Sequence, residues 1–509
     1  MKLPRLRLTG KPFGFLLLFI SSHLAIGQEA TAKSPSSTQA VGAIALNQVS
    51  PTAICPARLG EAIDAVIERP QFSRARWGVL IQTLSSANTL YARDRDRYFI
   101  PASNVKLLTT AAALRQLSPQ FRIRTSVYSM RTISNLAAVR VVGRGDPSLT
   151  DVQLQDLAQQ LKRQGYQQIQ QLAVDDGYFQ APAVNPSWEW GDLQANYGAP
   201  VNSVILNQNT VGLTLSPQTL GRPLQLNWTD PLEALGWRVE NNAVTTAAGS
   251  QASLGVMGVV GKPVLRLTGQ LPVDAKPNTL YLAVLDPAES FLRHFQSALR
   301  LQQIQVARTT IVANGEVGTE RELAAVESPP LASLLIETNQ NSNNLYAEAL
   351  LRSLIPRNQP AVAKSQPSLA TGLAAVKQNL TELGVDPQSY VLADGSGLSR
   401  HNLVSPDAIA QTLQAIAKTP VANIYRASLP VAGVSGTLKN RFQNTPAQGI
   451  FQAKTGTMSG VVALSGYLTP PTYQPLVVSI LVNQSDQSAA TIRQAMDEVV
   501  VLLTRLRSC

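Results

Sequence analysis

The hydrophobic and polar positions of this chain follow two different patterns along its length. Residues 59–67 carry apolar side chains at helical spacing, and residues 77–83 and 89–92 form two apolar runs on either side of a turn. A continuous apolar run follows Lys106, which predicts a helix buried on most sides. We therefore expect a helix, a hairpin and a buried helix before residue 120.

The middle of the chain has a β-like pattern. Between residues 121 and 325, short apolar runs are separated by Gly, Pro, Asn and Asp. Helical spacing interrupts this pattern near residues 154–164 and 288–302. The pattern predicts a β-rich insertion, which we expect to form two small domains.

Helical spacing returns after residue 326, with helices expected from residue 342, over residues 369–383 and at residues 490–507. Three apolar runs joined by short links predict an antiparallel meander, at 449–455, 461–468 and 476–483. Residues 53–120 and 326–509 are therefore expected to form one α+β domain, split by the insertion.

The first 27 residues have the pattern of an export signal. Four basic residues precede the apolar run Phe13 to Ile20, and Ala25-Ile26-Gly27 places small residues where a signal peptidase cleaves. A membrane anchor is the alternative, but the run is too short to cross roughly 30 Å of hydrocarbon. We expect cleavage before Gln28, a flexible leader over residues 28–52 and a periplasmic mature protein without a stable transmembrane anchor.

Composition narrows the classes of function. With 44% hydrophobic and 15% charged residues, the chain is too apolar to be disordered. The net charge of +11 falls to +7 once the signal is removed, and no basic run or aromatic-interleaved stripe favours nucleic acid. Of three histidines, only His294 and His401 would remain. Two histidines nearly exclude a His-rich zinc site and leave little room for a Ser-His-Asp triad. We expect no metal and no other cofactor.

A serine and a lysine stand three residues apart at the start of the predicted buried helix. At this spacing Ser103 and Lys106 share one helix face, so the amine can reach the hydroxyl. A serine needs a base to accept its proton, and burial lowers the pKa of a lysine. Of the twelve lysines, Lys106 alone has a serine three residues before it. The structural alternative is that Ser103 caps the helix.

A second pair combines a hydroxyl with an amide. Ser342 and Asn344 lie at the start of a predicted helix. The S-x-N pattern is weak by itself, since Ser86-Ala87-Asn88 also matches it. A helix cap at Ser342 is the structural alternative.

A third motif, Lys454-Thr455-Gly456-Thr457, places a cation and hydroxyls on a predicted strand. Gly456 lets a ligand backbone approach closely. The K-T-G string occurs once in the chain. The alternative is a plain exposed strand.

The ordered set S-x-x-K, S-x-N and K-T-G resembles the signature of penicillin-recognising serine enzymes. The 239 residues from Ser103 to Ser342 leave room for the insertion. This layout resembles the low-molecular-mass penicillin-binding proteins of the D-alanyl-D-alanine carboxypeptidase/endopeptidase type, peptidase family S13. The longer strings that carry the resemblance are Gly145-Asp146-Pro147, 188–192, 197–200 and 394–402. It implies a penicillin-binding/β-lactamase-like transpeptidase domain, an antiparallel sheet flanked by helices.

The resemblance also implies roles for the motif residues. Ser103 would attack the carbonyl between two D-alanines, with Lys106 as its general base. Ser342 would relay a proton towards the leaving amine, and Asn344 would orient Lys106 and the substrate. Lys454 would keep Lys106 neutral and attract the terminal carboxylate.

The same resemblance extends to the substrate. Thr455 and Thr457 would hydrogen-bond the terminal carboxylate, and the N–H groups of Ser103 and Thr457 would form the oxyanion hole. A pocket near the site would be lined by four residues, namely Asp192, Tyr197, Leu398 and Arg400. An aspartate beside an arginine suits the zwitterionic end of a diaminopimelate side chain. A structural Asp–Arg salt bridge is the alternative.

Cys55 and Cys509 are the only cysteines. An exported protein favours a disulfide over two unrelated thiols. In the penicillin-recognising fold the first and last helices lie side by side, which implies that the two thiols meet.

The sequence therefore predicts a serine-type D-Ala-D-Ala carboxypeptidase, a D,D-endopeptidase or both, acting on peptidoglycan stem peptides and inhibited covalently by β-lactams. A serine β-lactamase is one alternative, although the E-x-x-L-N string of one major class is absent and Glu348-Ala349-Leu350-Leu351-Arg352 only approaches it. A non-catalytic cell-wall-binding scaffold is another. The sequence indicates no oligomeric state.

Overall fold

The computed structural model describes residues 53–130, 137–179, 182–259, 261–315, 318–355 and 368–509. The expected signal peptide and leader lie outside these residues. In the part of the chain that is described, no helix has both the length and the apolar character needed to cross a membrane.

Five antiparallel strands form the sheet that carries the K-T-G motif. Their order is β19 (Phe451–Met458), β20 (Val461–Leu468), β21 (Leu476–Asn483), β1 (Arg76–Thr83) and β2 (Thr89–Arg93). The meander β19-β20-β21 follows the predicted order. Strand β1 pairs with β21 along its whole length, from Arg76 opposite Asn483 to Thr83 opposite Leu476, and so joins the two ends of the chain.

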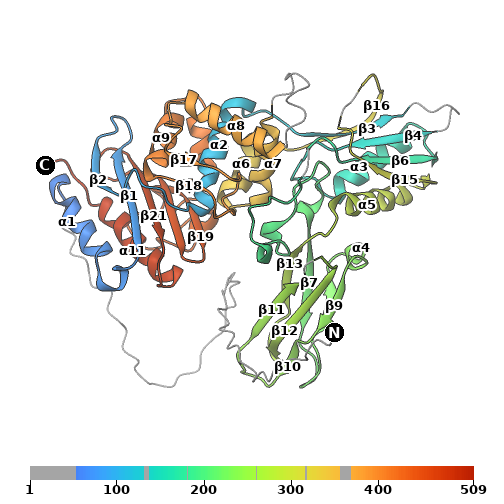
Figure 1. Ribbon diagram of the computed structural model, residues 1–509, viewed down its shortest axis with the longest axis horizontal. Helices are drawn as coiled ribbons and strands as arrows, with labels where there is room; N and C mark the ends of the chain where they lie inside the picture. The colour runs from blue at the N-terminus through green and yellow to red at the C-terminus, as the bar shows by residue number, and fades with distance from the viewer. Residues whose placement is uncertain (1–52, 131–136, 180–181, 260, 316–317, 356–367) are drawn as a thin grey trace, which may run out of the picture. The chain divides into compact units, whose positions relative to one another are not determined.

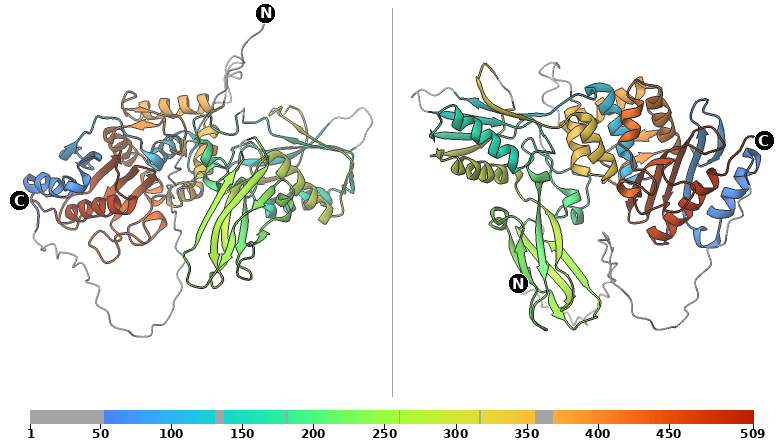
Figure 2. Two further views of the ribbon diagram at one scale, coloured as in Figure 1. Left: turned by 60° about the horizontal axis from the view of Figure 1, so that its bottom comes forward. Right: turned by 180° about the vertical axis from the view of Figure 1, so that it is seen from behind.

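Helices cover both faces of this sheet. Helices α1 (Pro56–Ile67) and α11 (Ala489–Leu503) lie side by side on one face, as Figures 1 and 2 show. On the other face pack α2 (Val105–Leu117) and α9 (Pro406–Ala417). Because both faces are covered, every residue of β20 and β21 is buried, which explains their unbroken apolar runs.

Further helices extend the core around α2. They are α6 (Leu331–Gln340), α7 (Asn344–Ser353), α8 (Ser368–Glu382) and α10 (Ala422–Ala427). The short strands β17 (Tyr390–Val391) and β18 (Leu403–Val404) pair beside them. The result is the α+β arrangement expected from the sequence.

The two ends of this domain are joined covalently. Cys55 precedes α1, Cys509 ends the chain, and their sulfur atoms form a disulfide with a Cα–Cα distance of 5.7 Å. Ile54 also pairs with Leu506 through backbone hydrogen bonds. The contact between α1 and α11 therefore brings the two cysteines together.

The first core of the insertion combines a five-stranded sheet with two helices. Its sheet has the order β15 (Thr309–Val312), β6 (Gln171–Asp175), β4 (Ala138–Val142), β3 (Arg124–Ser129) and β16 (Glu322–Glu327). The first three strands are parallel. Helices α3 (Asp151–Arg163) and α5 (Pro287–Leu301) pack on this sheet, and helical crossovers of this kind allow parallel pairing. The pair β5 (Gln168–Ile169) and β14 (Gln305–Val306) adds to this layer.

The second core of the insertion is antiparallel for the most part. One sheet has the order β13 (Asn278–Ala283), β7 (Thr210–Ser216) and β8 (Gln225–Trp228). The other contains β9 (Arg238–Asn241), β10 (Val244–Thr246), β11 (Ser253–Gly258) and β12 (Val264–Pro272). Both sheets contribute to one hydrophobic cluster, and the short helix α4 (Pro231–Ala234) follows β8.

Candidate active site

Ser103 lies in the short 3-10 helix η2 (Ala102–Asn104), which leads directly into α2. The Nζ atom of Lys106 lies 3.0 Å from Ser103 Oγ. No side-chain cap bond from Ser103 occurs at this helix start, so the capping alternative has no support. The hydroxyl stays partly accessible while the lysine is fully buried.

Two further oxygens hold Lys106. Its Nζ donates to Asn344 Oδ1 and to the carbonyl of Ser396, both at 2.6 Å. A neutral amine has two N–H donors and one lone pair. Two donated bonds therefore leave the lone pair for the Ser103 hydroxyl. Burial lowers the pKa of Lys106 to about 7, against opposing effects of Asp394 and Glu348.

Ser342 and Asn344 stand at the start of α7. The N-cap of this helix is Asn343, whose side chain accepts from the N–H of Tyr346. Ser342, with φ at +58°, is therefore not the cap. The amide of Asn344 bridges the site, since its Oδ1 accepts from Lys106 and its Nδ2 donates to the carbonyl of Tyr197 at 2.9 Å.

Lys454 lies on β19 and is fully buried. It is not part of a plain exposed strand. Its Nζ donates to Ser342 Oγ at 2.8 Å and to the carbonyl of Thr455 at 2.9 Å. Burial and the nearby Lys106 lower the pKa of Lys454. Two buried amines this close oppose each other's protonation.

The other residues of the K-T-G motif lie along the same strand. Thr455 Oγ1 donates to Thr437 Oγ1 at 2.7 Å, and Thr457 Oγ1 accepts from Arg493 at 3.2 Å. A Cβ at Gly456 would lie 2.9 Å from the carbonyl of Pro101. The glycine therefore allows β19 to approach the segment that carries Ser103.

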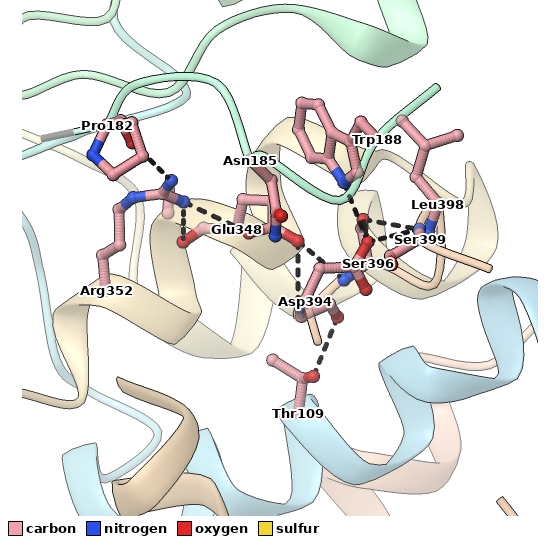
Figure 3. A network of polar contacts seen from close by, with 12 residues as sticks. Thr109, Pro182, Asn185, Trp188, Glu348, Arg352, Asp394, Ser396, Leu398 and Ser399 are labelled. Atoms are coloured by element: carbon pink, nitrogen blue, oxygen red, sulfur yellow. Dashed lines mark hydrogen bonds and ion pairs between the residues drawn. The ribbon is translucent and has the colours of Figure 1, made fainter. Parts of the chain in front are cut away.

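A loop of buried polar groups, residues 394–399, packs beside α7 and α2 (Figure 3), and its Ser396 carbonyl accepts from Lys106. The carboxylate of Asp394 accepts from the N–H groups of Gly397 and Ser399, both at 2.7 Å, and from the indole of Trp188 at 3.0 Å. Gly397 has φ at +84°, and a Cβ there would lie 1.9 Å from the carbonyl of Ala102. The loop thus touches the backbone beside the nucleophile and cannot take a larger residue at this point.

The four residues expected to line a substrate pocket have different surroundings. Tyr197 donates to Asp192 Oδ1 at 3.2 Å, and burial raises the pKa of Asp192. The ion pair of Arg400 is with Glu189, at 3.1 Å, rather than with Asp192. Leu398 packs in a cluster of apolar side chains beside α7. The structure therefore contains an ion pair between Arg400 and Glu189 in place of the direct Asp192–Arg400 salt bridge considered as the alternative.

Comparisons with known proteins identify the family. A family model described as D-Ala-D-Ala carboxypeptidase 3 (S13) matches residues 59–504. The chain belongs to this family. A D-alanyl-D-alanine carboxypeptidase of Actinomadura sp. is 35% identical over 433 residues, which are 81% of this chain and 79% of that protein. The expectation of family S13 is confirmed.

Solved structures agree with this assignment. Penicillin binding protein 4 (dacB) from Haemophilus influenzae is 25% identical with a TM-score of 0.75, covering 87% of this chain and 98% of that one. A structure of the same H. influenzae protein in complex with a β-lactam matches with 25% identity, the same coverage and a TM-score of 0.71. The predicted penicillin-binding fold class is confirmed.

One cluster outside the active site of this S13 member has the residue types of a metal site. His294 Nδ1 lies 2.7 Å from Asp151 Oδ1, and its Nε2 lies 3.2 Å from Asp230 Oδ2. Burial lowers the pKa of His294, but the hydrogen bonds to Asp151, Asp230 and Glu233 outweigh it and raise the pKa to about 11. A doubly protonated imidazole paired on both sides makes this cluster an ion-pair network between the two cores of the insertion.

Sequence reasoning missed several residues that shape the site. Glu348 was considered only as an imperfect match to a β-lactamase motif, and no role was expected for Ser396, Asp394 or Arg493. The spacing of Asn344 and Glu348, four residues apart on one helix face, is the signal that could have directed attention to Glu348.

Proposed function

We propose that this S13-family protein cleaves the bond between the two D-alanines of peptidoglycan stem peptides through an acyl-enzyme at Ser103. The observation that carries the proposal is the contact of 3.0 Å between Ser103 Oγ and Lys106 Nζ. The lysine is held by two other acceptors, so its lone pair is directed to the hydroxyl.

In the first step Lys106 takes the proton of Ser103 while the serine oxygen attacks the carbonyl carbon of the penultimate D-alanine. The backbone N–H groups of Ser103 and Thr457 stabilise the oxyanion that forms. Such a donor contributes about 2.7–4 kcal/mol to the stability of the transition state.

In the second step the C–N bond breaks and the terminal D-alanine leaves. Its amine needs a proton, which Ser342 relays: the hydroxyl gives its proton to the amine and recovers the one that Lys106 took from Ser103, so that Lys106 is neutral again. Lys454 Nζ donates to Ser342 Oγ at 2.8 Å and holds this hydroxyl. Lys454, Thr455 and Thr457 bind the terminal carboxylate. Water then hydrolyses the acyl ester, again with Lys106 as the base.

We assign the outer pocket to the side chain of the stem peptide. Asp192 would bind an ammonium group, and Arg400 would bind a carboxylate after exchanging its contact with Glu189. Tyr197 and Leu398 would flank the chain between these two charges. The diaminopimelate end of a stem peptide carries both groups.

The proposal includes covalent inhibition by β-lactams, because they present a similar carbonyl and carboxylate to the same residues. It also includes action in the periplasm, after export by the expected signal. A β-lactamase of the class that deacylates with a glutamate base would need that glutamate free. Both oxygens of Glu348 are engaged, by Gly395 and Ser396 on one side and Arg352 on the other.

The test combines labelling with product analysis. Purified protein is incubated with fluorescent penicillin and, separately, with peptidoglycan whose released pieces are identified by mass. Ser103→Ala should abolish labelling and D-alanine release without unfolding the protein. Ser342→Ala should slow both, whereas Ser86→Ala, in the chance S-x-N match of the β1–β2 turn, should slow neither. Labelling of Ser342 in the Ser103 variant, or a wild type that is never labelled, contradicts the proposal.

A further inference from the structure

The buried carboxylate of Glu348 is linked to the general base Lys106 through a single residue, Ser396. Glu348 lies on α7, one turn after Asn344, and has no exposed surface. Its Oε1 accepts from the N–H of Gly395 at 2.7 Å and from the N–H of Ser396 at 2.9 Å. The carbonyl of Ser396 in turn accepts from Lys106 at 2.6 Å.

The carboxylate is itself held on its other side. Arg352, also buried, lies 3.2 Å from Glu348 Oε2, as Figure 3 shows. Asn344, Glu348 and Arg352 follow one another at intervals of four and so share one face of α7. The carbonyl of Gly395 accepts from Thr109 of α2 at 2.8 Å. The Gly395–Ser396 peptide, which directly precedes the Ser396 carbonyl bound by Lys106, is therefore anchored to both α7 and α2.

The charges that face Glu348 are those of Arg352 on α7, Asp394 on the loop and Lys106 on α2. Burial and Asp394 raise the pKa of Glu348 to about 7, and Arg352 opposes this. In return, the negative charge of Glu348 raises the pKa of Lys106. Burying a charge is costly, and a neutral side chain could also accept from the two backbone N–H groups. These hydrogen bonds alone therefore do not explain a carboxylate at this position. The carboxylate differs from a neutral side chain in its charge, which acts on Lys106 electrostatically.

We propose that Glu348 is a positioning residue for the acylation of Ser103: through the Gly395–Ser396 backbone it fixes the carbonyl that orients Lys106, and its charge tunes the proton affinity of that amine. This inference rests on the proposed function. It assigns Glu348 no contact with the substrate.

The test is the pH dependence of acylation by fluorescent penicillin in Glu348→Gln. The amide keeps an oxygen for the two N–H groups but removes the charge. The acid limb of the rate profile should move to lower pH by on the order of one unit. Because Gln leaves Arg352 as a buried unpaired cation, the double variant Glu348→Gln/Arg352→Met provides the same measurement without that cost.

In Glu348→Ala the Gly395–Ser396 peptide loses its anchor to α7 and keeps only that to α2. The acylation rate above pH 8 should then fall by about ten- to a hundredfold. Folded Gln variants with an unshifted acid limb would show that the carboxylate is structural only, and would overturn the inference. A wild type that penicillin does not label would instead contradict the proposed function. The two failures are therefore distinguishable.

A second, independent observation concerns Arg493, in the second turn of α11. Its Nη2 donates to Thr457 Oγ1 at 3.2 Å. The nearest carboxylate along the helix, Asp497, is bound by Arg441 at 2.5 Å. Within the described residues no carboxylate forms an ion pair with Arg493. An arginine remains protonated in proteins. A half-buried cation therefore stands beside the end of the K-T-G strand, and the acidic group near it, Asp497, forms its ion pair with Arg441.

We infer that Arg493 determines specificity for a substrate with a free C-terminal carboxylate. The inference rests on the proposed function, in which Thr457 binds that group. A guanidinium beside Thr457 can add a charge-assisted hydrogen bond to the same carboxylate. A peptide whose C-terminal carboxylate is replaced by an amide would not profit from the contact.

The test compares Arg493→Gln with the wild type on an acyl-D-Ala-D-Ala peptide and on its C-terminal amide. The kcat/KM for the free acid should fall about ten- to a hundredfold, and that for the amide by less than about threefold. Arg163→Gln, an exposed arginine of α3, is the matched control. Equal losses on the two substrates would overturn the inference and leave the proposed function intact, whereas a wild type inactive on both would contradict the proposed function.

Discussion

The acylation of Ser103 should depend on pH through the ionisation of Lys106. Only the neutral amine can accept the serine proton, and burial lowers the pKa of Lys106 to about 7. At pH 7 roughly half of the amines are then neutral. An ordinary lysine, with a pKa near 10.4, would be neutral in roughly one molecule in several thousand at this pH. Burial thus raises the concentration of the active form about a thousandfold.

The measurement is the second-order rate constant of acylation by fluorescent penicillin, followed by stopped flow between pH 5.5 and 9. The rate constant should fall about tenfold for each pH unit well below the pKa of Lys106 and level off about one unit above it. Circular dichroism at each pH verifies that the fold is retained. Lys439→Ala, which removes an exposed lysine, should reproduce the wild-type profile, while Lys106→Ala should lose both the limb and most of the rate.

Two results would refute the reasoning. A rate constant that is flat from pH 5.5 to 8.5 would mean that no base with a pKa near 7 is needed. A rate constant that still rises tenfold per unit up to pH 9 would mean that Lys106 keeps an ordinary pKa despite its burial.

Three further predictions follow from the same structure. Because the pKa of Lys106 is lowered in the folded state, the native protein releases this proton at a lower pH than the unfolded chain does. The free energy of urea unfolding of the wild type should therefore rise relative to that of Lys106→Met, by up to about 1.4 kcal/mol per pH unit above pH 7. A constant difference between the two proteins from pH 7 to 9 would contradict this. Arg400→Ala should reduce turnover of muropeptides with a free diaminopimelate end more than turnover of short D-Ala-D-Ala peptides. Glu189→Gln, which removes the ion-pair partner of Arg400, should not cause this selective loss. Equal losses in the two variants would support a structural role of the Arg400–Glu189 pair. Cys55→Ser should lower the free energy of unfolding by roughly 2–4 kcal/mol in thermal melts, while activity survives at low temperature. Thiol counting on the denatured, unreduced wild type should find no free thiol, and two free thiols per chain would refute the Cys55–Cys509 disulfide.

The local pattern of the sequence was sufficient for most elements of the catalytic domain. The apolar spacing of residues 59–67 and the run after Lys106 correspond to α1 and α2, and the three predicted strands of the meander are β19, β20 and β21. These elements form where local periodicity and burial agree. The parallel pairing of β4, β6 and β15 in the insertion could not be read in this way, because a parallel neighbour is set by crossovers and not by a strand's own residues.

The site shows the same division. Motif spacing alone paired Ser103 with Lys106, since three residues along a helix suffice to bring the two groups together. The contact of Arg400 with Glu189 instead of Asp192, and that of Arg493 with Thr457, join segments far apart in the chain. No periodicity carries information on such contacts, and the sequence therefore carried no sign that Glu189 is the ion-pair partner of Arg400.

The sequence by itself determined the order of the helices and strands around the three motifs, the family and the identity of the candidate nucleophile and base, because each depends on residues that are neighbours along the chain. Only the tertiary structure decided which carbonyl accepts a hydrogen bond from Lys106 and which hydroxyl accepts one from Lys454. It also decided which backbone N–H groups the carboxylate of Glu348 binds. These contacts arise when α2, α7, β19 and the loop at Ser396 pack into one buried volume. In that volume an unpaired polar group is costly, so most of the buried polar groups have a partner, and distance along the chain no longer limits which partner that is.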